Sequence, residues 1–216
     1  MRWDLLAVAI AVLSLVIVYR RDRAFRRRLR ADFFTECLGI FQTYRVVQDD
    51  VYYPVLTGKY DGFDVRLEPI VDHIAWRKIP SLWLKVSVLR AVPHRGVFDL
   101  LMRPQATEFY SPSGDLDERV PVPADWPKDA VVYTNDAAAM PPLQAVEPHV
   151  HIFNDPKMKE LVIAPGGVRL VYQVCQADRS HYAVLRQIEF PVTRLAPGLA
   201  KSLIDSAVEI YGSVAA

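Results

Sequence analysis

The sequence predicts an α+β fold, in which an N-terminal transmembrane helix precedes one mainly antiparallel sheet domain with packed helices. Three observations lead to this prediction. An uncharged apolar run near the N-terminus is followed by seven arginines. The spacing of apolar residues then changes from three or four residues to two, which indicates a change from helix to strands. Finally, short turns separate the strand-like segments, which is typical of antiparallel pairing.

The length of 216 residues accommodates a membrane segment and one domain. We expect residues 1–30 to form a transmembrane anchor with a basic juxtamembrane segment, and residues 31–216 to form a cytoplasmic α+β domain. Apolar residues make up 51% of the chain, so a packed core is expected. The two cysteines, Cys37 and Cys175, are too few for a disulfide framework. We expect packed thiols, with a disulfide between the two as the alternative.

The segment from Leu5 to Val18 carries no charge and is bracketed by Trp3 and Tyr19, aromatic residues that favour membrane interfaces. As a helix it reaches about 21 Å, against a hydrocarbon core of about 30 Å. Snorkelling arginines or local bilayer thinning would accommodate so short a span. A cleaved signal peptide is an alternative, but it needs its positive charge before the apolar run, and here the seven arginines follow that run. A buried core helix would leave the basic flank hard to place, so we expect an uncleaved anchor.

A basic flank follows the apolar run, and only Asp22 opposes it. Its seven arginines are Arg20, Arg21, Arg23, Arg26, Arg27, Arg28 and Arg30. Positive charge beside a span resists translocation and stays in the cytoplasm, and the upstream flank has only Arg2. The sequence therefore predicts a single-pass membrane protein with its N-terminus outside and its C-terminal domain cytoplasmic.

The basic flank has two interpretations. If the helix continues through residue 30, its arginines occupy an arc of about 220°, and Phe25, Leu29 and Asp22 lie on the opposite side. The simpler interpretation is a topology signal on a solvated helix. The more specific interpretation is recognition of anionic lipid headgroups. Each basic residue near the membrane surface contributes about 1 kcal/mol to the free energy of such binding.

The chain beyond the basic flank has an acidic balance. From residue 31 onward, 18 basic residues face 23 acidic ones, which leaves a net charge of −5. This balance disfavours nucleic acid as the main partner. We expect the partners to be the membrane, through its hydrocarbon core and its anionic lipid, and another protein.

The first half of the domain is expected to contain a helix and a meander of about four strands. Residues 31–47 repeat apolar positions at spacings of three and four, which predicts a helix leading from the membrane into the core. Residues 52–72 predict two strands joined at Asp61-Gly62, a pair that accepts the positive φ angles of a tight hairpin. Residues 81–92 and 96–104 predict two further strands.

A long surface loop is expected over residues 104–130, which are rich in proline, aspartate, serine and glycine. A short strand over residues 131–136 should follow it. Residues 141–155 then predict a helix, which Pro148 should kink or end.

The end of the chain is expected to contain three strands over residues 160–190 and a terminal helix over residues 195–214. Pro197 falls at a plausible first-turn position of that helix. Both halves place a helix before a run of strands, but no residue-by-residue repeat supports a duplication.

The nearest approach to a metal-binding pattern is His149 and His151, with Asp155 close by. On a strand the two histidines would share a face, but on the predicted helix they lie about 200° apart and cannot hold one ion. We therefore expect exposed or capping histidines and no metal. No glycine-rich phosphate motif occurs between a strand and a helix, so we expect no cofactor.

Two short pairs contain residue types found in hydrolase triads, namely Asp72-His73 and Ser180-His181. The G-x-S-x-G elbow that would present a nucleophilic serine is absent. Ser180 also falls in a predicted turn, so turn chemistry is the favoured interpretation and no catalytic residue is assigned.

A stretch with flanking tryptophans predicts an interface. Trp76, Arg77, Lys78 and Trp83 could form an amphipathic edge that meets lipid headgroups or a partner. The alternative, which we favour, places Trp83 in the core and the two basic residues in a turn.

These features predict a single-pass, membrane-anchored, non-enzymatic binding or scaffold module at the cytoplasmic membrane face. The alternative is an enzyme or a lipid-handling protein that acts on a membrane-associated substrate. An enzyme would be favoured by a deep pocket lined by two or more of Asp72, His73, His149, His151 and His181. Lipid handling would be favoured by an apolar cavity under the sheet.

Overall fold

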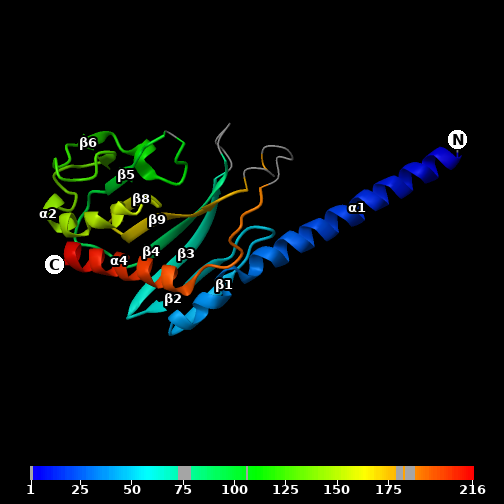
Figure 1. Ribbon diagram of the computed structural model, residues 1–216, viewed down its shortest axis with the longest axis horizontal. Helices are drawn as coiled ribbons and strands as arrows, with labels where there is room; N and C mark the ends of the chain where they lie inside the picture. Colours follow the sequence, from blue (N-terminus) through cyan, green and yellow to red (C-terminus); the bar gives the residue numbers. More distant parts are fainter. Residues whose placement is uncertain (1, 73–78, 106, 179–181, 183–187) are drawn as a thin grey trace.

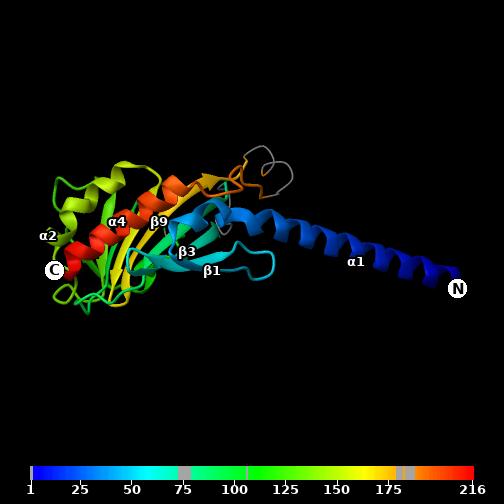
Figure 2. The ribbon, with the colours of Figure 1, turned by 90° about the horizontal axis from the view of Figure 1, so that it is seen from below.

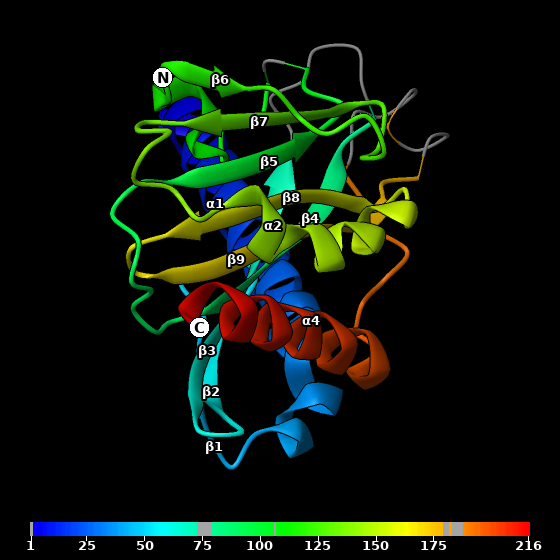
Figure 3. The ribbon, with the colours of Figure 1, turned by 90° about the vertical axis from the view of Figure 1, so that its left-hand side faces the viewer.

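The fold is given by a computed structural model, which describes residues 2–72, 79–105, 107–178, 182 and 188–216. The described strands form one nine-stranded sheet in the order β1-β2-β3-β4-β9-β8-β5-β7-β6 (Figures 1 and 3). Their bounds are β1 Thr43–Val47, β2 Val55–Tyr60, β3 Phe63–Asp72, β4 Ser81–Val88, β5 Phe98–Met102, β6 Glu118–Val120, β7 Ala130–Thr134, β8 Met158–Ala164 and β9 Gly167–Gln176. All the pairs of neighbouring strands are antiparallel.

The helices differ sharply in their relation to this sheet. α1 (Arg2–Ala31) extends far out from the rest of the molecule, as Figures 1 and 2 show. The remaining helical segments are η1 Asp32–Ile40, η2 Pro112–Asp115, α2 Leu143–Val146, η3 Glu147–Asn154 and α4 Pro197–Ala215. The predicted α+β fold, with a long apolar N-terminal helix before an antiparallel sheet, is confirmed.

The main core lies between α4 and the middle of the sheet (Figure 3). The buried side chains of α4 recur every three or four residues, and they include Leu203, Ala207 and Ile210. Strand β4 presents alternate residues such as Leu84 and Val86 to the same core. The two periods, that of a helix and that of a strand, therefore bring apolar faces together, as the sequence pattern predicted.

Tight turns join the strands at the expected places. Asp61 and Gly62 link β2 to β3 with φ angles of 47° and 79°, which confirms the predicted hairpin. Gly167 begins β9 with a φ of 142°, and a Cβ atom there would lie 2.0 Å from the carbonyl oxygen of Val88. Only glycine fits this position, because both the φ angle and the neighbouring backbone exclude a side chain.

The prediction of one helix over residues 31–47 is wrong in its second half. The helical segment ends at Ile40, and residues 43–47 form the edge strand β1. The ring of Phe41 packs against Gly58 of β2, where an added Cβ would lie 2.8 Å from it. Beyond Phe41 the β-branched residues pair with β2, and this pairing outweighs the helical spacing of apolar residues.

The predicted four-strand meander is also wrong in its last member. β4 pairs with β3 and β9, whereas β5 lies farther along the sheet between β8 and β7. All five residues of β5 are buried. A strand that is buried on both faces belongs in the interior of a sheet, and hydropathy alone does not reveal which neighbours it has.

The region of the predicted 141–155 helix contains two shorter segments. α2 ends at Val146, and η3 continues from Glu147 with Pro148 in its first turn. Pro148 thus marks the break that the sequence predicted. Two of the three strands expected over residues 160–190 are present as β8 and β9, and the described residues 188–190 form no strand. Most of the third expected strand lies outside the described residues.

Candidate functional site

α1 is long and apolar enough to cross a membrane, and it is the one such helix among the described residues. None of its apolar window is buried against the rest of the fold, which excludes the interpretation as a core helix. A signal sequence near the N-terminus would meet the same criteria of length and composition. The part of α1 that follows the apolar run nevertheless has contacts with the domain that a disposable leader does not need.

The last turns of α1 dock on the β1–β2 loop. Arg23 Nε lies 2.6 Å from Asp50 Oδ1 in an ion pair. Arg30 Nη1 donates a hydrogen bond of 2.8 Å to the carbonyl oxygen of Val51. These contacts connect the helix to the sheet, because Arg23 and Arg30 bind the loop that leads directly into β2.

An aromatic ring extends this docking into the core. The guanidinium carbon of Arg30 lies 5.0 Å from the ring centroid of Tyr53. The Tyr53 ring in turn meets Phe33 of η1 edge to face, with centroids 5.0 Å apart. Burial raises the pKa of the Tyr53 hydroxyl to about 12, so the hydroxyl stays neutral and available as a hydrogen-bond donor.

Five of the seven arginines remain outside these contacts, and one of the five, Arg26, pairs with Asp22 within α1. The guanidinium groups of Arg20, Arg21, Arg27 and Arg28 are exposed and make no hydrogen bond or ion pair with the part of the chain that the structure describes. At 100° per residue they share an arc of about 120° on α1. The basic flank is therefore divided between a docked side and an open, purely basic side.

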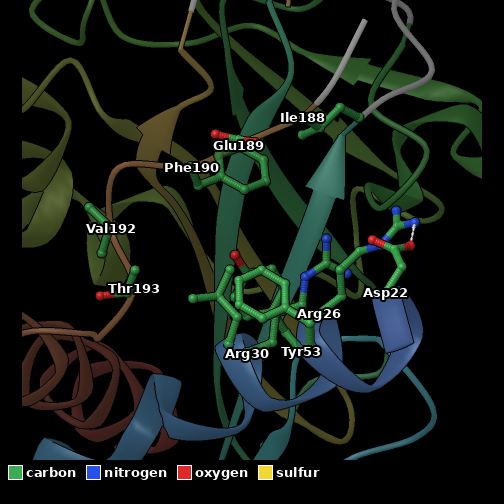
Figure 4. A pocket seen from close by; sticks show the side chains of 11 residues that line it. Asp22, Arg26, Arg30, Tyr53, Ile188, Glu189, Phe190, Val192 and Thr193 are labelled. Carbon is green, nitrogen blue, oxygen red and sulfur yellow. Dashed lines mark hydrogen bonds and ion pairs between the residues drawn. The ribbon is translucent and has the colours of Figure 1, made fainter. Parts of the chain in front are cut away.

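A groove lies on a third side of α1, between this helix and residues 188–193 (Figure 4). Its volume is about 600 Å³. The α1 wall carries Phe25 and Leu29, which are 65% and 51% exposed. Ile188, Phe190 and Val192 line the groove from the other segment. The groove thus combines two apolar walls with a position directly after the apolar run.

Charged groups balance one another at the rim of the groove. Arg26 forms an ion pair with Asp22 one turn earlier on α1, as the dashed line in Figure 4 shows. Arg30 and Glu189 complete the charged lining. Asp22 is already paired with Arg26. Arg30 contacts the Val51 carbonyl oxygen and the Tyr53 ring.

The predicted interface residues are only partly placed. Trp76, Arg77 and Lys78 lie outside the described residues. Trp83 lies in β4 and packs its ring against Tyr110, with centroids 5.7 Å apart. An interface in this stretch stays a prediction.

The candidate metal and triad residues do not come together in the described part of the chain. His149 Nε2 lies 2.7 Å from Ser213 Oγ of α4, and His151 Nδ1 lies 2.8 Å from the Pro148 carbonyl oxygen. Within residues 2–72, 79–105, 107–178, 182 and 188–216, no group of three or more potential ligands could hold a metal ion. Asp72 ends β3, whereas His73, Ser180 and His181 lie outside these ranges.

The sequence reasoning missed a buried pair of carboxyl groups. Asp99 of β5 and Glu160 of β8 are both 0% exposed. Burial, reinforced by the charge of Glu160, raises the pKa of Asp99 to about 8, and burial also raises the pKa of Glu160. Ser111 Oγ donates a hydrogen bond of 3.1 Å to Asp99 Oδ2. The signal that could have revealed the pair was a single acid in each of two mainly apolar strands, although β8 also contains Lys159 beside Glu160.

A second buried contact fastens the loop that supplies Ser111. Lys159 Nζ lies 2.8 Å from Glu108 Oε1, and both side chains are 6% exposed. The same ammonium donates hydrogen bonds to the carbonyl oxygens of Met102 and Arg103. The Pro-rich loop is thus held to the sheet by a satisfied buried charge, which identifies these polar residues as structural.

No protein-family model matches the chain, and no curated protein matches it in sequence. Among solved structures, the chain is similar to the crystal structure of the mycobacterial trehalose monomycolate transport factor A, TtfA. The identity is 13%, over 74% of this chain and 70% of that chain, and the TM-score is 0.38. A likeness at this score is too weak to transfer a fold or a function.

Proposed function

We propose that the protein is a single-pass, membrane-anchored, non-enzymatic binding module at the cytoplasmic membrane face, where its open arginines gather anionic lipid. The observation that carries the proposal is the division of the basic flank of α1. Arg23 and Arg30 hold the domain to the helix. The guanidinium groups of Arg20, Arg21 and Arg27 make no hydrogen bond or ion pair with the described chain, although the Arg27 carbonyl oxygen accepts a hydrogen bond from Gln48 Nε2.

This division has a mechanical consequence. A helix that is docked at its end transmits its orientation in the bilayer to the sheet, because η1 continues it into the core through the buried residues Phe33, Phe34 and Cys37. The domain is then held at a fixed distance from the membrane surface. Arg27 and Arg28 lie about 12 to 14 Å beyond Tyr19 along the helix, close enough for long side chains to meet the headgroup layer.

Charge favours the cytoplasmic orientation. Seven arginines follow the apolar run and one precedes it, and such an asymmetry retains the basic side in the cytoplasm. A reporter fused after Ala216 should be active only in the cytosol. Digestion of the domain by protease added outside intact cells would contradict the orientation.

Lipid selection can be tested with a matched pair of variants. The full chain is reconstituted in vesicles of phosphatidylcholine and phosphatidylglycerol and then extracted in mild detergent, and the ratio of the two retained lipids is measured. The variant Arg27→Gln/Arg28→Gln removes two open arginines. Each contributes at most about 1 kcal/mol to the attraction for anionic lipid, so enrichment of phosphatidylglycerol should fall severalfold. The control Arg45→Gln/Arg95→Gln removes two exposed arginines of the domain and should change nothing. Equal ratios in the wild type and both variants would refute lipid gathering.

A protein partner is the second candidate, and the edge strand β1 favours it. All five of its residues are exposed, including Tyr44 at 52% and Val47 at 48%. It ends the sheet, so the backbone groups on its outer side pair with no described strand. An extended segment of a partner could add to such an edge. Proline lacks the backbone N–H that such pairing uses. Val46→Pro should therefore release a partner that co-purifies with the wild-type chain. Val16→Pro in the span is the comparison variant and affects only membrane insertion.

The enzyme alternative gains no support from the groove. Asp72, His149 and His151 do not line it, and its lining combines apolar side chains with charged ones. Lipid handling was expected to require an apolar cavity under the sheet, whereas the groove described above lies beside α1.

A further inference from the structure

We infer that the groove beside α1 binds one anionic phospholipid lifted from the cytoplasmic leaflet, with its headgroup toward Arg30 and an acyl chain trailing along Leu29 and Phe25 toward the bilayer. This inference rests on the membrane insertion proposed above. It adds a ligand site that is separate from the open arginines, because the groove lies on a different side of α1.

The first support is a continuous stripe on the helix. Leu15, Val18, Asp22, Phe25 and Leu29 follow one another at spacings of three and four, so they lie along one side of α1. The apolar members are 51% to 70% exposed. The stripe begins within the predicted span and ends in the groove. The longest interval between neighbouring apolar members is that from Val18 to Phe25, about two helical turns, with Asp22 between them.

The one polar member of the stripe does not block it. Asp22 forms its ion pair with Arg26, which removes most of the penalty that a lone carboxylate would impose beside a hydrocarbon chain. Asp22 lies about 5 Å beyond Tyr19 along the helix, at the level of the headgroups, where a charged pair remains hydrated. The pair thus marks the entrance of the groove at the membrane surface.

The second support is the shape and chemistry of the opposite wall. Ile188, Phe190 and Val192 line the groove from the segment across from α1 (Figure 4), and Phe25 and Leu29 belong to the same lining. Ligand pockets typically enclose about 300 to 1,000 Å³, and this groove of about 600 Å³ falls within that range. Two apolar walls that face water are costly unless something covers them. An acyl chain covers both walls at once.

The third support is the polar end of the groove. Of the five N–H donors on the Arg30 guanidinium, one binds the Val51 carbonyl oxygen, so others can meet a phosphate. The hydroxyl of Tyr53 lies in the same lining and stays protonated because burial raises its pKa. Arg30 is about 16 Å beyond Tyr19 along the helix, so a headgroup that reaches it leaves its acyl chain directed back toward the membrane.

The experiment uses the full chain in nanodiscs of phosphatidylcholine and phosphatidylglycerol. A trace of phosphatidylglycerol carries a photoreactive diazirine in its acyl chain, and a parallel sample uses phosphatidylcholine with the same chain. After illumination, tryptic peptides are analysed by mass spectrometry. Trypsin cuts after Arg186 and Arg194, so the outer groove wall is released as the peptide 187–194. We expect adducts on this peptide and on the α1 span, with more labelling of 187–194 by phosphatidylglycerol.

A matched pair of variants tests the path of the chain. Leu29→Asp places a charge in the groove and should reduce labelling of peptide 187–194 about tenfold, which corresponds to about 1.4 kcal/mol. Leu89→Asp changes a leucine of similar exposure, 48% against 51%, outside the groove and should leave the labelling unchanged. Arg30→Gln should abolish the preference for phosphatidylglycerol.

The outcomes separate the two proposals. Adducts on the span without adducts on 187–194 would overturn the groove site and leave the anchored module intact. Absence of adducts on both would overturn both. Equal labelling of 187–194 by the two lipids would overturn the headgroup assignment, and equal effects of Leu29→Asp and Leu89→Asp would overturn the path along α1.

Discussion

The buried pair of Asp99 and Glu160 makes the stability of the fold depend on pH, and Asp99→Asn tests this directly. The Asp99 carboxyl has a pKa of about 8 in the folded state, against 3.8 as the ordinary value, chiefly because the group is buried. Between these two pH values the folded state binds a proton that the unfolded state has released. Stability is therefore highest below about pH 4 for this group and is lost as the pH rises toward 8.

The magnitude follows from proton linkage. One extra proton bound by the folded state lowers the free energy of unfolding by about 1.4 kcal/mol for each unit of increasing pH. From pH 5 to pH 7 the wild type should lose about 3 kcal/mol through the carboxyl pair to which Asp99 belongs. Asparagine keeps the shape of the side chain but binds no proton. Its stability curve should therefore be flatter by about 1.4 kcal/mol per pH unit over the same range.

The assay is urea unfolding of the full chain in detergent micelles at several pH values, followed by tryptophan fluorescence. Trp83 reports on this side of the sheet because its ring packs against Tyr110, next to Ser111. Asp117→Asn, at an exposed position of the Pro-rich loop, is the matched control and should have the slope of the wild type. Parallel curves for the wild type and Asp99→Asn would show that Asp99 is ionised in the fold and that the reasoning is wrong.

Three further substitutions test the packing. Gly167→Ala should destabilise the fold by at least about 3 kcal/mol in the same urea assay, because its Cβ would lie 2.0 Å from the Val88 carbonyl oxygen. Phe33→Ala removes a fully buried ring and should cost about 3 to 5 kcal/mol, measured as a shift of the urea midpoint, with loosening of α1 seen as faster proteolysis after Arg28. Lys159→Ala should cost about 3 to 5 kcal/mol at pH 7, because it leaves Glu108 buried without its cation. The loss should shrink when the pH is lowered enough to protonate Glu108, and a loss independent of pH would contradict the role of this ion pair.

Much of the fold could be predicted because the relevant signals are local. The β2–β3 hairpin was visible in Asp61-Gly62, since a two-residue turn with positive φ angles needs only its own residues. The terminal helix was visible in the spacing of Leu199, Leu203 and Ala207 after Pro197. Its exact partners in the sheet were not visible, because spacing identifies an apolar face and not what covers it.

The errors share one physical cause. Residues 43–47 carried a helical spacing but became a strand, because pairing with β2 and the packing of Phe41 on Gly58 outweigh local preference. β5 was assigned to a meander, although its neighbours β7 and β8 follow it in the chain, and Phe98 of β5 pairs with Ile163 of β8, 65 residues later. Contacts between distant segments decide such placements, and one sequence contains no direct record of them.

The amino-acid sequence by itself determined that a short apolar helix with seven arginines on one flank precedes an antiparallel α+β fold. Only the tertiary structure decided which arginines grip the domain, which remain open, and that Phe25 and Leu29 face residues 188–193 across a groove. The reason is that residue composition and the spacing of apolar residues describe only one continuous segment of the chain. A site, by contrast, is made where segments more than 150 residues apart in sequence meet in space.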